Sequence, residues 1–331
     1  MNANQDKIKA LGLCSGGLDS ILAALVLQKQ GIHVEWICFE TPFFFSDKAK
    51  KAAQITGISL TVKDITETYL EMLRDPNCGY GKNMNPCMDC HALMFKMAGE
   101  IMFKRGCHFL FSGEVLGQRP MSQTRNALKY VEKHSGMKGY ILRPLSAQKL
   151  DETIPEQKGW VDRQKLMDIA GRGRKRQIGL AAEFGITQYP APAGGCLLTD
   201  KDYCRRLKDL LDHKKNVSAN ELTLLRYGRH FRTLSRVKII VGRTQQDNKN
   251  IYKYHDPESE TIMTVANHPS PAVLVSGGAN PGELYLAAAI CAGYSKMPDK
   301  LTVEVRATSK KGSDILRVLP VKPSEVKHLL V

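Results

Sequence analysis

The stretch that decides the fold is SGGLDS, residues Ser15 to Ser20. The apolar run KIKALGLCS leads into it and predicts a buried strand, and LDSILAALVLQKQG predicts an apolar-faced helix that ends at Gly31. Two glycines between a strand and a helix allow a tight turn, in which backbone amides and the positive end of the helix dipole can hold a phosphate group. The stretch therefore predicts a phosphate-binding loop after a first strand.

Turn chemistry alone leaves another interpretation of this loop open. Asp19 or Ser20 could cap the following helix, and the loop would then be an ordinary connection between a strand and a helix. The loop lacks the Gly-Lys-Ser/Thr ending of a Walker loop and the spacing of the dinucleotide-binding Gly-x-Gly-x-x-Gly motif. Two common kinds of nucleotide loop are thereby excluded.

Strands and helices alternate through the first part of the chain. A helical spacing of apolar residues from Cys90 to Gly106 separates the predicted strands, which are HVEWICFE (33–40), SLTVKDIT (59–66) and CHFLFSGE (107–114). Regular alternation predicts an α/β domain with a mostly parallel sheet and helices on both faces. Such sheets bind ligands at the carboxyl ends of their strands.

The pattern changes after about residue 205. A polar helical stretch, 206–230, predicts a connector. Short strands then follow in RVKIIVGR, TIMTVAN, AVLVSGG, LTVEVRA and ILRVLPV, with one helix of small residues in PGELYLAAAICAGYS. We expect an α/β domain over 1–205, the connector over 206–230 and a smaller α+β domain over 231–331.

The charge balance points to a polyanionic partner. The 331 residues carry a formal net charge of +15, and the pI is near 9.4, which favours nucleic acid over a membrane surface. We find no apolar run of about eighteen residues, and the opening residues lack the features of a secretion signal. We therefore expect a cytoplasmic protein with no membrane partner.

The segment NPCMDCH, Asn85 to His91, allows three interpretations. Cys-x-x-Cys-His is the attachment motif of a c-type haem, Cys-x-x-Cys is half of many zinc sites, and two close thiols can handle sulfur or hold an iron–sulfur cluster. The expected cytoplasmic location disfavours haem. Zinc would need His91 or Cys78 as further ligands, and the chain has no second Cys-x-x-Cys. Cys87 and Cys90 just precede the predicted helix, whose dipole favours thiolates.

The remaining cysteines differ in context. Cys196 follows Pro192, Gly194 and Gly195 in a predicted turn and is a third candidate for sulfur or metal chemistry. Those in apolar or strand contexts are expected to be buried and inert, namely Cys14, Cys38, Cys107 and Cys291. Cys204 stays unassigned.

The whole hexapeptide after a first strand resembles the PP-loop of the ATP pyrophosphatases. That resemblance implies cleavage of ATP between its α and β phosphates, so that a substrate oxygen is adenylylated, pyrophosphate leaves and a nucleophile then displaces AMP. The residues implied to hold the pyrophosphate portion are Ser15, Gly16, Gly17 and Ser20. Asp19 is implied to lie near Mg²⁺ or the phosphates.

A second segment, 111–128, indicates which family of the ATP pyrophosphatases the chain resembles. Its sequence FSGEVLGQRPMSQTRNAL resembles the TGE-x-LGQ-x-x-SQT stretch of the tRNA 4-thiouridine sulfurtransferases, and this implies that Gly113, Glu114 and Gln118 bind the nucleotide. The later ILRPLSAQKLDETI resembles that family's next strand. Ser112 stands where the family motif has threonine, and the family's N-terminal RNA-binding extension and rhodanese domain are not found. The alternative is a glycine turn leading to a helix capped near Ser122.

This likeness gives the cysteines a context. The rhodanese-free thiolases that the arrangement resembles bind a 4Fe-4S cluster through Cys-x-x-Cys and one distant cysteine, which implies that role for Cys87, Cys90 and Cys196. One iron would remain free to carry sulfide. A persulfide relay through Cys196 or Cys87 is the alternative. The sulfur donor would be a cysteine desulfurase or free sulfide.

Two basic or RNA-like segments remain. GRGRKRQ, 171–177, predicts either a solvated face or a contact with an RNA backbone. The tail resembles the RNA-binding domain of NFACT proteins through 241–243, Asn248, Asn250 and a later apolar strand that ends in glycines. The alternative is a small domain for stability or for a homodimer.

These observations predict an ATP-dependent tRNA sulfurtransferase that makes a thiouridine. A uracil carbonyl oxygen would be adenylylated, pyrophosphate would leave, and sulfur would displace AMP. Asp19, Cys87 and Cys196 are the predicted catalytic residues. The alternatives are a PP-loop ligase that uses ammonia on a small molecule, and a non-catalytic adaptor that binds RNA or the ribosome.

Overall fold

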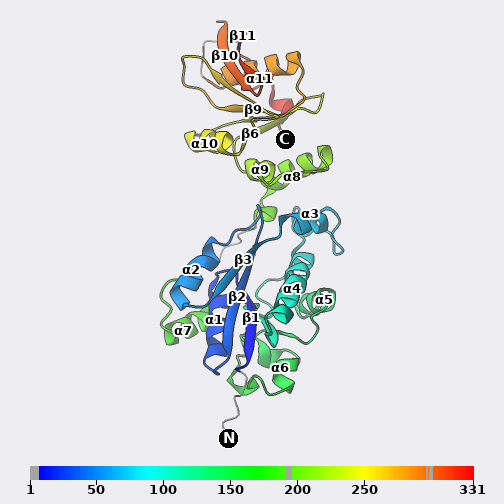
Figure 1. Ribbon diagram of the computed structural model, residues 1–331, viewed down its shortest axis with the longest axis vertical. Helices are drawn as coiled ribbons and strands as arrows, with labels where there is room; N and C mark the ends of the chain where they lie inside the picture. The colour runs from blue at the N-terminus through cyan, green and yellow to red at the C-terminus, as the bar shows by residue number, and fades with distance from the viewer. Residues whose placement is uncertain (1–6, 191–195, 296, 298–300) are drawn as a thin grey trace. The chain divides into compact units, whose positions relative to one another are not determined.

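The computed structural model describes residues 7–190, 196–295, 297 and 301–331. The chain forms two compact units, 1–199 and 200–331, which are named unit 1 and unit 2 (Figure 1). The division lies a few residues before the expected boundary near 205, and the polar helical stretch belongs to unit 2. Each unit has its own sheet and its own buried core.

Unit 1 is an α/β domain, as predicted. Its five-stranded sheet has the order β3-β2-β1-β4-β5, and every neighbouring pair is parallel. The strands are β1 (Lys9–Leu13), β2 (His33–Glu40), β3 (Leu60–Asp64), β4 (Phe109–Ser112) and β5 (Ile141–Leu142). The helices are α1 (Leu18–Gln28), α2 (Asp47–Thr56), α3 (Thr66–Arg74), α4 (Cys87–Lys104), α5 (Arg125–Ser135), α6 (Ile154–Gln157) and α7 (Lys175–Glu183). α1 packs with α7 on one face of the sheet, and α4 packs with α3 and α5 on the other (Figure 1).

The centre of the sheet places two loops side by side. β1 pairs with β2 on one side and with β4 on the other, so the strand order reverses between β1 and β4. Leu13 pairs with both Ile37 and Ser112, which puts the carboxyl ends of β1 and β4 at one level, while β2 continues to Glu40. Open parallel sheets bind ligands at such a reversal, because the loops after the two strands diverge there.

Close packing beneath these loops depends on a glycine. A Cβ at Gly12 in β1 would lie 2.2 Å from the tip of the Phe111 ring, so only glycine lets that ring lie against the central strand. Phe111 is 1% exposed and belongs to the core between the sheet and α1. Burial of aromatic rings of this size stabilises the sheet beneath the loops.

Unit 2 is an α+β domain around an antiparallel sheet of order β11-β10-β8-β9-β7-β6. Its strands are β6 (Arg229–Arg232), β7 (Lys238–Val241), β8 (Thr261–Val265), β9 (Val273–Val275), β10 (Val303–Ser309) and β11 (Gly312–Val318). Its helices are α8 (Lys201–His213), α9 (Ala219–Leu224), α10 (Gln245–Tyr254) and α11 (Pro281–Gly293). α11 packs in the core on one face of the sheet, while residues of α9 and α10 form a second cluster with the other face. Sequence reasoning did not predict α10, whose polar residues begin after the capping side chain of Thr244.

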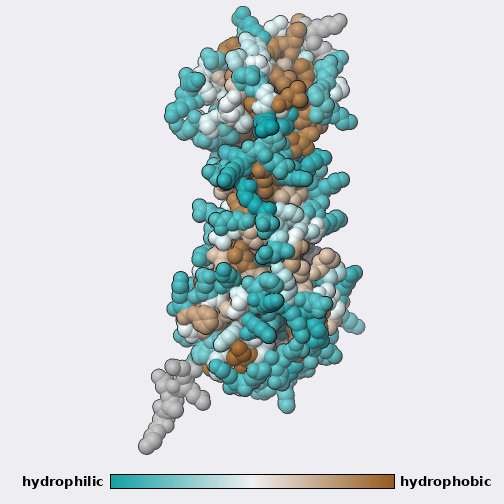
Figure 2. Space-filling model, turned by 90° about the vertical axis from the view of Figure 1, so that its right-hand side faces the viewer, coloured by the Kyte–Doolittle hydropathy of each residue, from teal (hydrophilic) through white to brown (hydrophobic). Residues whose placement is uncertain are grey.

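The surface of unit 2 includes apolar side chains. The face shown in Figure 2 is largely hydrophilic, with apolar side chains gathered mainly on unit 2. Exposed examples are Leu234, Ile315 and Leu319. Isolated apolar side chains are common on protein surfaces, so the homodimer stays a prediction. None of the helices in the described part of the chain has the length and apolar character needed to cross a membrane.

Candidate functional site

The PP-loop stretch forms a tight turn between β1 and α1. Gly16 has φ +72°, and a Cβ there would lie 2.1 Å from the backbone carbon of Lys48, so the position requires glycine twice over. Gly17 is the N-cap of α1, and no described side chain caps this helix. The Ser20 hydroxyl donates to the Gly17 carbonyl at 2.8 Å, which excludes the capping interpretation for that residue. The helix terminus can therefore offer its amides to an anion.

The loop after β4 lies directly against the PP-loop. A Cβ at Gly113 would lie 2.4 Å from the backbone carbon of Asp19 and 2.4 Å from the amide nitrogen of Ser20. The two backbones can approach this closely only because Gly113 has no side chain. The predicted residues Asp19, Ser20 and Gly113 thus meet at one place.

Asp19 is held by an amide from the same loop. Gln118 Nε2 donates to Asp19 Oδ2 at 2.8 Å, and Gln177 Nε2 donates to Gln118 Oε1 at 3.2 Å. Burial raises the pKa of Asp19, while Gln118, Arg174 and Arg119 act in the opposite direction. A half-buried carboxylate that faces two cations suits a place where a metal ion and phosphates meet.

Glu114 is buried among polar partners. It is 6% exposed, accepts from Arg143 Nε at 3.0 Å and lies 2.8 Å from His91 Nδ1. Burial would raise the pKa of Glu114, but Arg143 and His91 outweigh burial and lower it to about 2. Glu114 is therefore ionised at neutral pH. Its contacts with Arg143, the residue after β5, and with His91 of α4 attach both elements to the loop after β4.

The three candidate cysteines lie in one part of unit 1. Cys87 and Cys90 belong to the first turn of α4, rather than to the segment before it as expected. Cys196 directly precedes a short 3-10 helix, Leu197–Thr199, whose Leu197 amide donates to the Phe43 carbonyl. Burial raises the pKa of Cys90, its hydrogen bond with Tyr69 lowers it, and the thiols of Cys196 and Cys87 raise it. These effects on the pKa require the three thiols to be neighbours. The turn predicted over 192–195 lies outside the described residues.

Across the described ranges, no group of three His, Cys, Asp or Glu side chains is arranged to hold one metal ion. Thiolates around a single zinc ion would lie roughly 4 Å apart, because each Zn–S bond is about 2.3 Å. In a 4Fe-4S cluster each thiolate binds a different iron, and Cys87, Cys90 and Cys196 stay the predicted ligands of such a cluster.

Two residues inside the NPCMDCH segment have roles that sequence reasoning missed. His91, considered only as a zinc ligand, uses Nδ1 to contact Glu114. Asp89 is 4% exposed and accepts from the Cys78 amide at 2.8 Å and from the Tyr130 hydroxyl at 2.7 Å. Both residues connect the start of α4 to neighbouring segments. The sequence signal that could have indicated these contacts was the presence of an acidic residue and a histidine beside the cysteines.

Part of the basic segment 171–177 faces the PP-loop. Gln177 is fully buried and Arg174 is half-buried, whereas Arg172, Lys175 and Arg176 are exposed. The Gly171 amide donates to the Leu116 carbonyl at 2.7 Å, which attaches the segment to the loop after β4. Only the exposed cations of the segment are therefore available to an RNA backbone, and the remainder packs on unit 1.

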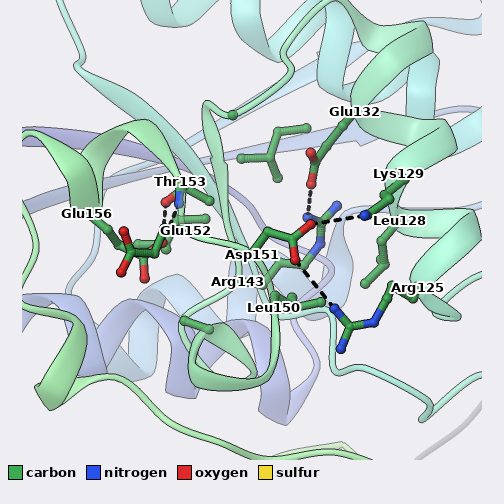
Figure 3. Close-up of a pocket in the computed structure, with 14 residues that line it drawn as sticks. Arg125, Leu128, Lys129, Glu132, Arg143, Leu150, Asp151, Glu152, Thr153 and Glu156 are labelled. Carbon is green, nitrogen blue, oxygen red and sulfur yellow. Dashed lines mark hydrogen bonds and ion pairs between the residues drawn. The ribbon is translucent and has the colours of Figure 1, made fainter.

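A hollow beside Arg143 is separate from the PP-loop (Figure 3). It has a volume of about 60 Å³, well below the roughly 300 to 1,000 Å³ of ligand pockets. Its charged side chains pair with one another: Asp151 contacts Lys129 at 3.0 Å and Arg125 at 3.6 Å, and Arg143 contacts Glu132 (Figure 3). The two remaining charged side chains, Glu152 and Glu156, pair with Arg163 outside the hollow.

In unit 2, the residues that carried the NFACT likeness stabilise the fold. Asn248 Oδ1 accepts from the Ala272 amide at 3.0 Å, and Arg243 Nε contacts Asp247 Oδ2 at 3.2 Å. Arg206 lies near Arg205 and Arg243, and both of these cations lower its pKa together with burial. Cations held this close to one another favour a polyanionic partner.

Comparisons with known proteins match unit 1 and unit 2 to two different families. Residues 5–157 match the family described as Thiamine biosynthesis protein (ThiI), and residues 228–330 match the NFACT protein RNA binding domain. The tRNA-specific 2-thiouridylase MnmA 2 of Thermoanaerobacter sp. (strain X514) is 26% identical over 223 residues, which cover 60% of this chain and 57% of that protein. A probable tRNA sulfurtransferase of Caldanaerobacter subterraneus subsp. tengcongensis is 31% identical over 171 residues, covering 49% of this chain and 40% of that one.

Among solved structures, a 4-thiouridine synthetase–RNA complex with bound ATP is similar with a TM-score of 0.35 and 20% identity, covering 55% of this chain and 54% of that chain. The matched stretches span about half the length of the curated relatives.

Proposed function

Because the chain joins a PP-loop domain of the ThiI type to an NFACT-type RNA-binding domain, we propose that it is an ATP-dependent tRNA sulfurtransferase. One observation carries the proposal. His91, next to Cys90 on α4, contacts Glu114, and the neighbouring Gly113 packs against Asp19 of the PP-loop. The thiols and the nucleotide loop therefore belong to one connected site.

The PP-loop suits the activation step. A uracil carbonyl oxygen attacks the α-phosphorus of ATP, the bond to the bridging oxygen breaks, and pyrophosphate leaves with the bonding electrons. The amides at the start of α1 face the developing negative charge, and the turn at Gly16 and Gly17 lets the phosphates approach them. Mg²⁺ would neutralise further phosphate charge, with Asp19 as the oxygen ligand that the loop offers.

The cysteines suit the second step, in which a sulfur nucleophile adds to the activated carbon and AMP leaves. A 4Fe-4S cluster held by Cys87, Cys90 and Cys196 would supply an iron site for sulfide at this place. Burial and the neighbouring Cys196 and Cys87 raise the pKa of Cys90 and so disfavour its free thiolate, and binding of the sulfur to iron would replace the thiol proton. In the alternative relay, Cys87 or Cys196 carries a persulfide and another cysteine resolves it, leaving a disulfide that a reductant must cleave.

Unit 2 and the exposed cations of unit 1 suit tRNA. The NFACT match covers most of unit 2, and Arg172, Lys175 and Arg176 are exposed on unit 1. Contacts of such cations with phosphates would hold RNA without reading its sequence. A cysteine desulfurase or free sulfide would provide the sulfur.

The test measures two products of the proposed reaction, pyrophosphate and a thionucleoside. Anaerobically prepared wild type, incubated with ATP, Mg²⁺, sulfide and tRNA, is expected to release pyrophosphate and to yield a thionucleoside detectable by mass spectrometry. Cys90→Ala should lose the thionucleoside, and the matched control Cys38→Ala, a buried cysteine of β2, should keep it. Release of pyrophosphate only with ammonia and a small substrate would favour a ligase. Absence of pyrophosphate with reconstituted protein would favour an RNA-binding adaptor.

A further inference from the structure

The loop that follows β2 carries three phenylalanines in a row. In this loop, residues 41–46, named the FFF loop, Phe43 is fully buried, whereas Phe45 is 46% exposed. The loop is closed by two backbone hydrogen bonds, of 3.0 and 3.2 Å, that Thr41 and Phe44 exchange. It follows the carboxyl end of a parallel strand, which is the edge where such sheets bind ligands. An exposed aromatic ring is thus presented at the ligand-binding edge of unit 1.

The FFF loop contacts the neighbours of two candidate thiols. The Leu197 amide, in the residue after Cys196, donates to the Phe43 carbonyl at 3.0 Å. The ring of Tyr69 lies 5.5 Å from the ring of Phe43, measured between their centroids. Tyr69 is in turn hydrogen-bonded to Cys90. The loop is therefore part of the surroundings of the sulfur site.

The chain just beyond the FFF loop lies against the PP-loop. A Cβ at Gly16 would lie 2.1 Å from the backbone carbon of Lys48 and 2.4 Å from the amide nitrogen of Ala49. Lys48 comes three residues after Phe45, so their Cα atoms are at most about 11 Å apart. Phe45 consequently lies on a stretch of chain that reaches both the nucleotide loop and the sulfur site.

Exposed cations follow the exposed phenylalanine. Helix α2 has one acidic residue, Asp47, and three exposed lysines, which are Lys48, Lys50 and Lys51. Aromatic rings stack on nucleic-acid bases, and neighbouring cations contact the backbone phosphates. An aromatic side chain followed by a basic helix therefore suits single-stranded or unpaired RNA, whose bases are free to stack.

We propose that Phe45 stacks on a base of the tRNA substrate and that the lysines of α2 contact the phosphates next to that base. This deepens the proposed function and rests on it for the identity of the RNA. Phe45 acts as a binding residue and supplies no chemistry of its own. Stacking is tolerant of base identity, since every base has a π-face, so Phe45 holds a nucleotide beside the site without selecting its sequence.

The first test is steady-state thiolation of an unmodified tRNA transcript by the full chain. Phe45→Ala should raise KM for tRNA about tenfold, because one stacked base is lost. It should leave kcat near wild type, since stacking holds the base equally in the bound substrate and in the transition state. Phe45→Tyr keeps an aromatic ring and should restore KM. The matched control Phe103→Ala, an exposed phenylalanine of α4, should behave like wild type.

Phe45→Trp gives a direct readout of stacking, because a stacked base quenches tryptophan fluorescence. Wild type contains two tryptophans, Trp36 and Trp160, whose emission is the baseline. The tRNA transcript should quench Phe45→Trp well beyond that baseline. Phe103→Trp is the control, and it should lose only the light that the RNA absorbs. Equal quenching of the two variants would overturn the stacking role of Phe45.

Binding of a non-hydrolysable ATP analogue separates the two nucleotides that could stack on this ring. Wild type and Phe45→Ala should bind the analogue equally, and a tenfold loss in the variant would place the adenine of ATP on Phe45 instead of an RNA base. If wild type thiolates tRNA and Phe45→Ala keeps the wild-type KM, only this inference fails. If wild type neither binds nor thiolates tRNA, the proposed function fails, and this inference fails with it.

Discussion

His91 Nδ1 lies 2.8 Å from Glu114 Oε1, and this contact connects the helix that carries Cys87 and Cys90 to the loop that packs on Asp19. His91 comes directly after Cys90, so its ring orientation is coupled to the position of that thiol. Glu114 is held in turn by Arg143, which is 3% exposed. The helix that carries the two cysteines and the loop that packs on Asp19 are thus connected through Glu114.

We expect His91→Ala to lower thiolation about tenfold, because one charge-assisted hydrogen bond that orients α4 is lost. ATP-analogue binding and the metal content of the purified protein should stay near wild type, since His91 is assigned no metal. The measurement is thionucleoside yield alongside titration calorimetry and metal analysis. His33→Ala, an exposed histidine of β2, is the control. Loss of bound metal in His91→Ala would instead make His91 a ligand.

Glu114→Gln should destabilise unit 1 at neutral pH by about 2 kcal/mol, because the buried Arg143 loses one of its two carboxylate partners and keeps only Glu132. The pKa of Glu114 lies at about 2 in the folded protein, below its ordinary value of 4.5. Its contribution is therefore present above pH 4.5 and is lost as the pH falls toward 2.

The difference between wild type and Glu114→Gln should accordingly shrink over that acidic range. Urea unfolding at several pH values measures it. Asp151→Asn, which affects an exposed pair with Lys129, should change stability little at any pH. A stability difference for Glu114→Gln that does not vary with pH would contradict the assigned ion pair.

Cys90→Ala should remove a broad iron–sulfur absorbance band from anaerobically purified protein, together with iron and sulfide, because a cluster loses one of its predicted thiolates. Absorbance spectra and metal and sulfide counts provide the measurement. The buried Cys107→Ala, at the start of the segment leading to β4, should leave the band intact. A colourless wild type that resists reconstitution would shift the assignment to a persulfide relay.

Gly113→Ala should abolish ATP-analogue binding or unfold the loop, because the new Cβ would lie 2.4 Å from the Asp19 backbone. Gly173→Ala is the matched control, since a Cβ there meets no described atom within 4 Å and its φ is not positive. Calorimetric titration and thermal melting together distinguish loss of binding from loss of folding. Equal binding by the two variants would show that the PP-loop and the loop after β4 can move apart without loss of binding free energy.

Replacement of the exposed cations Arg172, Lys175 and Arg176 by alanine should weaken tRNA binding across sequences. The slope of log affinity against log salt should fall by about 0.7 to 0.9 for each phosphate contact that is lost. Gel-shift titrations in rising salt measure the slope. Lys310→Ala, a cation of unit 2 that pairs with Glu258, serves as the control, and identical slopes for all proteins would exclude this surface from RNA binding.

Much of the fold could be predicted because it rests on local patterns. Apolar runs of strand length and helical spacing of apolar residues identified β1 to β4, β7 to β11 and helices α1, α4 and α11, whereas β6 was wrongly included in the helical connector and β5 was found only by resemblance. Helix α10 was missed, since its polar sequence shows little apolar periodicity and it depends on the Thr244 cap and on Ile251 packing under the sheet. The expected separate connector turned out to belong to unit 2, because α9 contributes to that unit's core.

By itself, the sequence determined the glycine turn after the first strand, the parallel sheet and the cysteine pair, because each depends on neighbouring residues and their spacing, while the tail was identified by its resemblance to the NFACT domain. Only the tertiary structure decided that Gln118 holds Asp19 from 99 positions away and that Nδ1 of His91 contacts Glu114. It also decided that Gln177 is buried within a basic segment whose Arg172, Lys175 and Arg176 are exposed. Contacts of this kind depend on the order of strands in the sheet, which places β4 beside β1 and so brings distant side chains together.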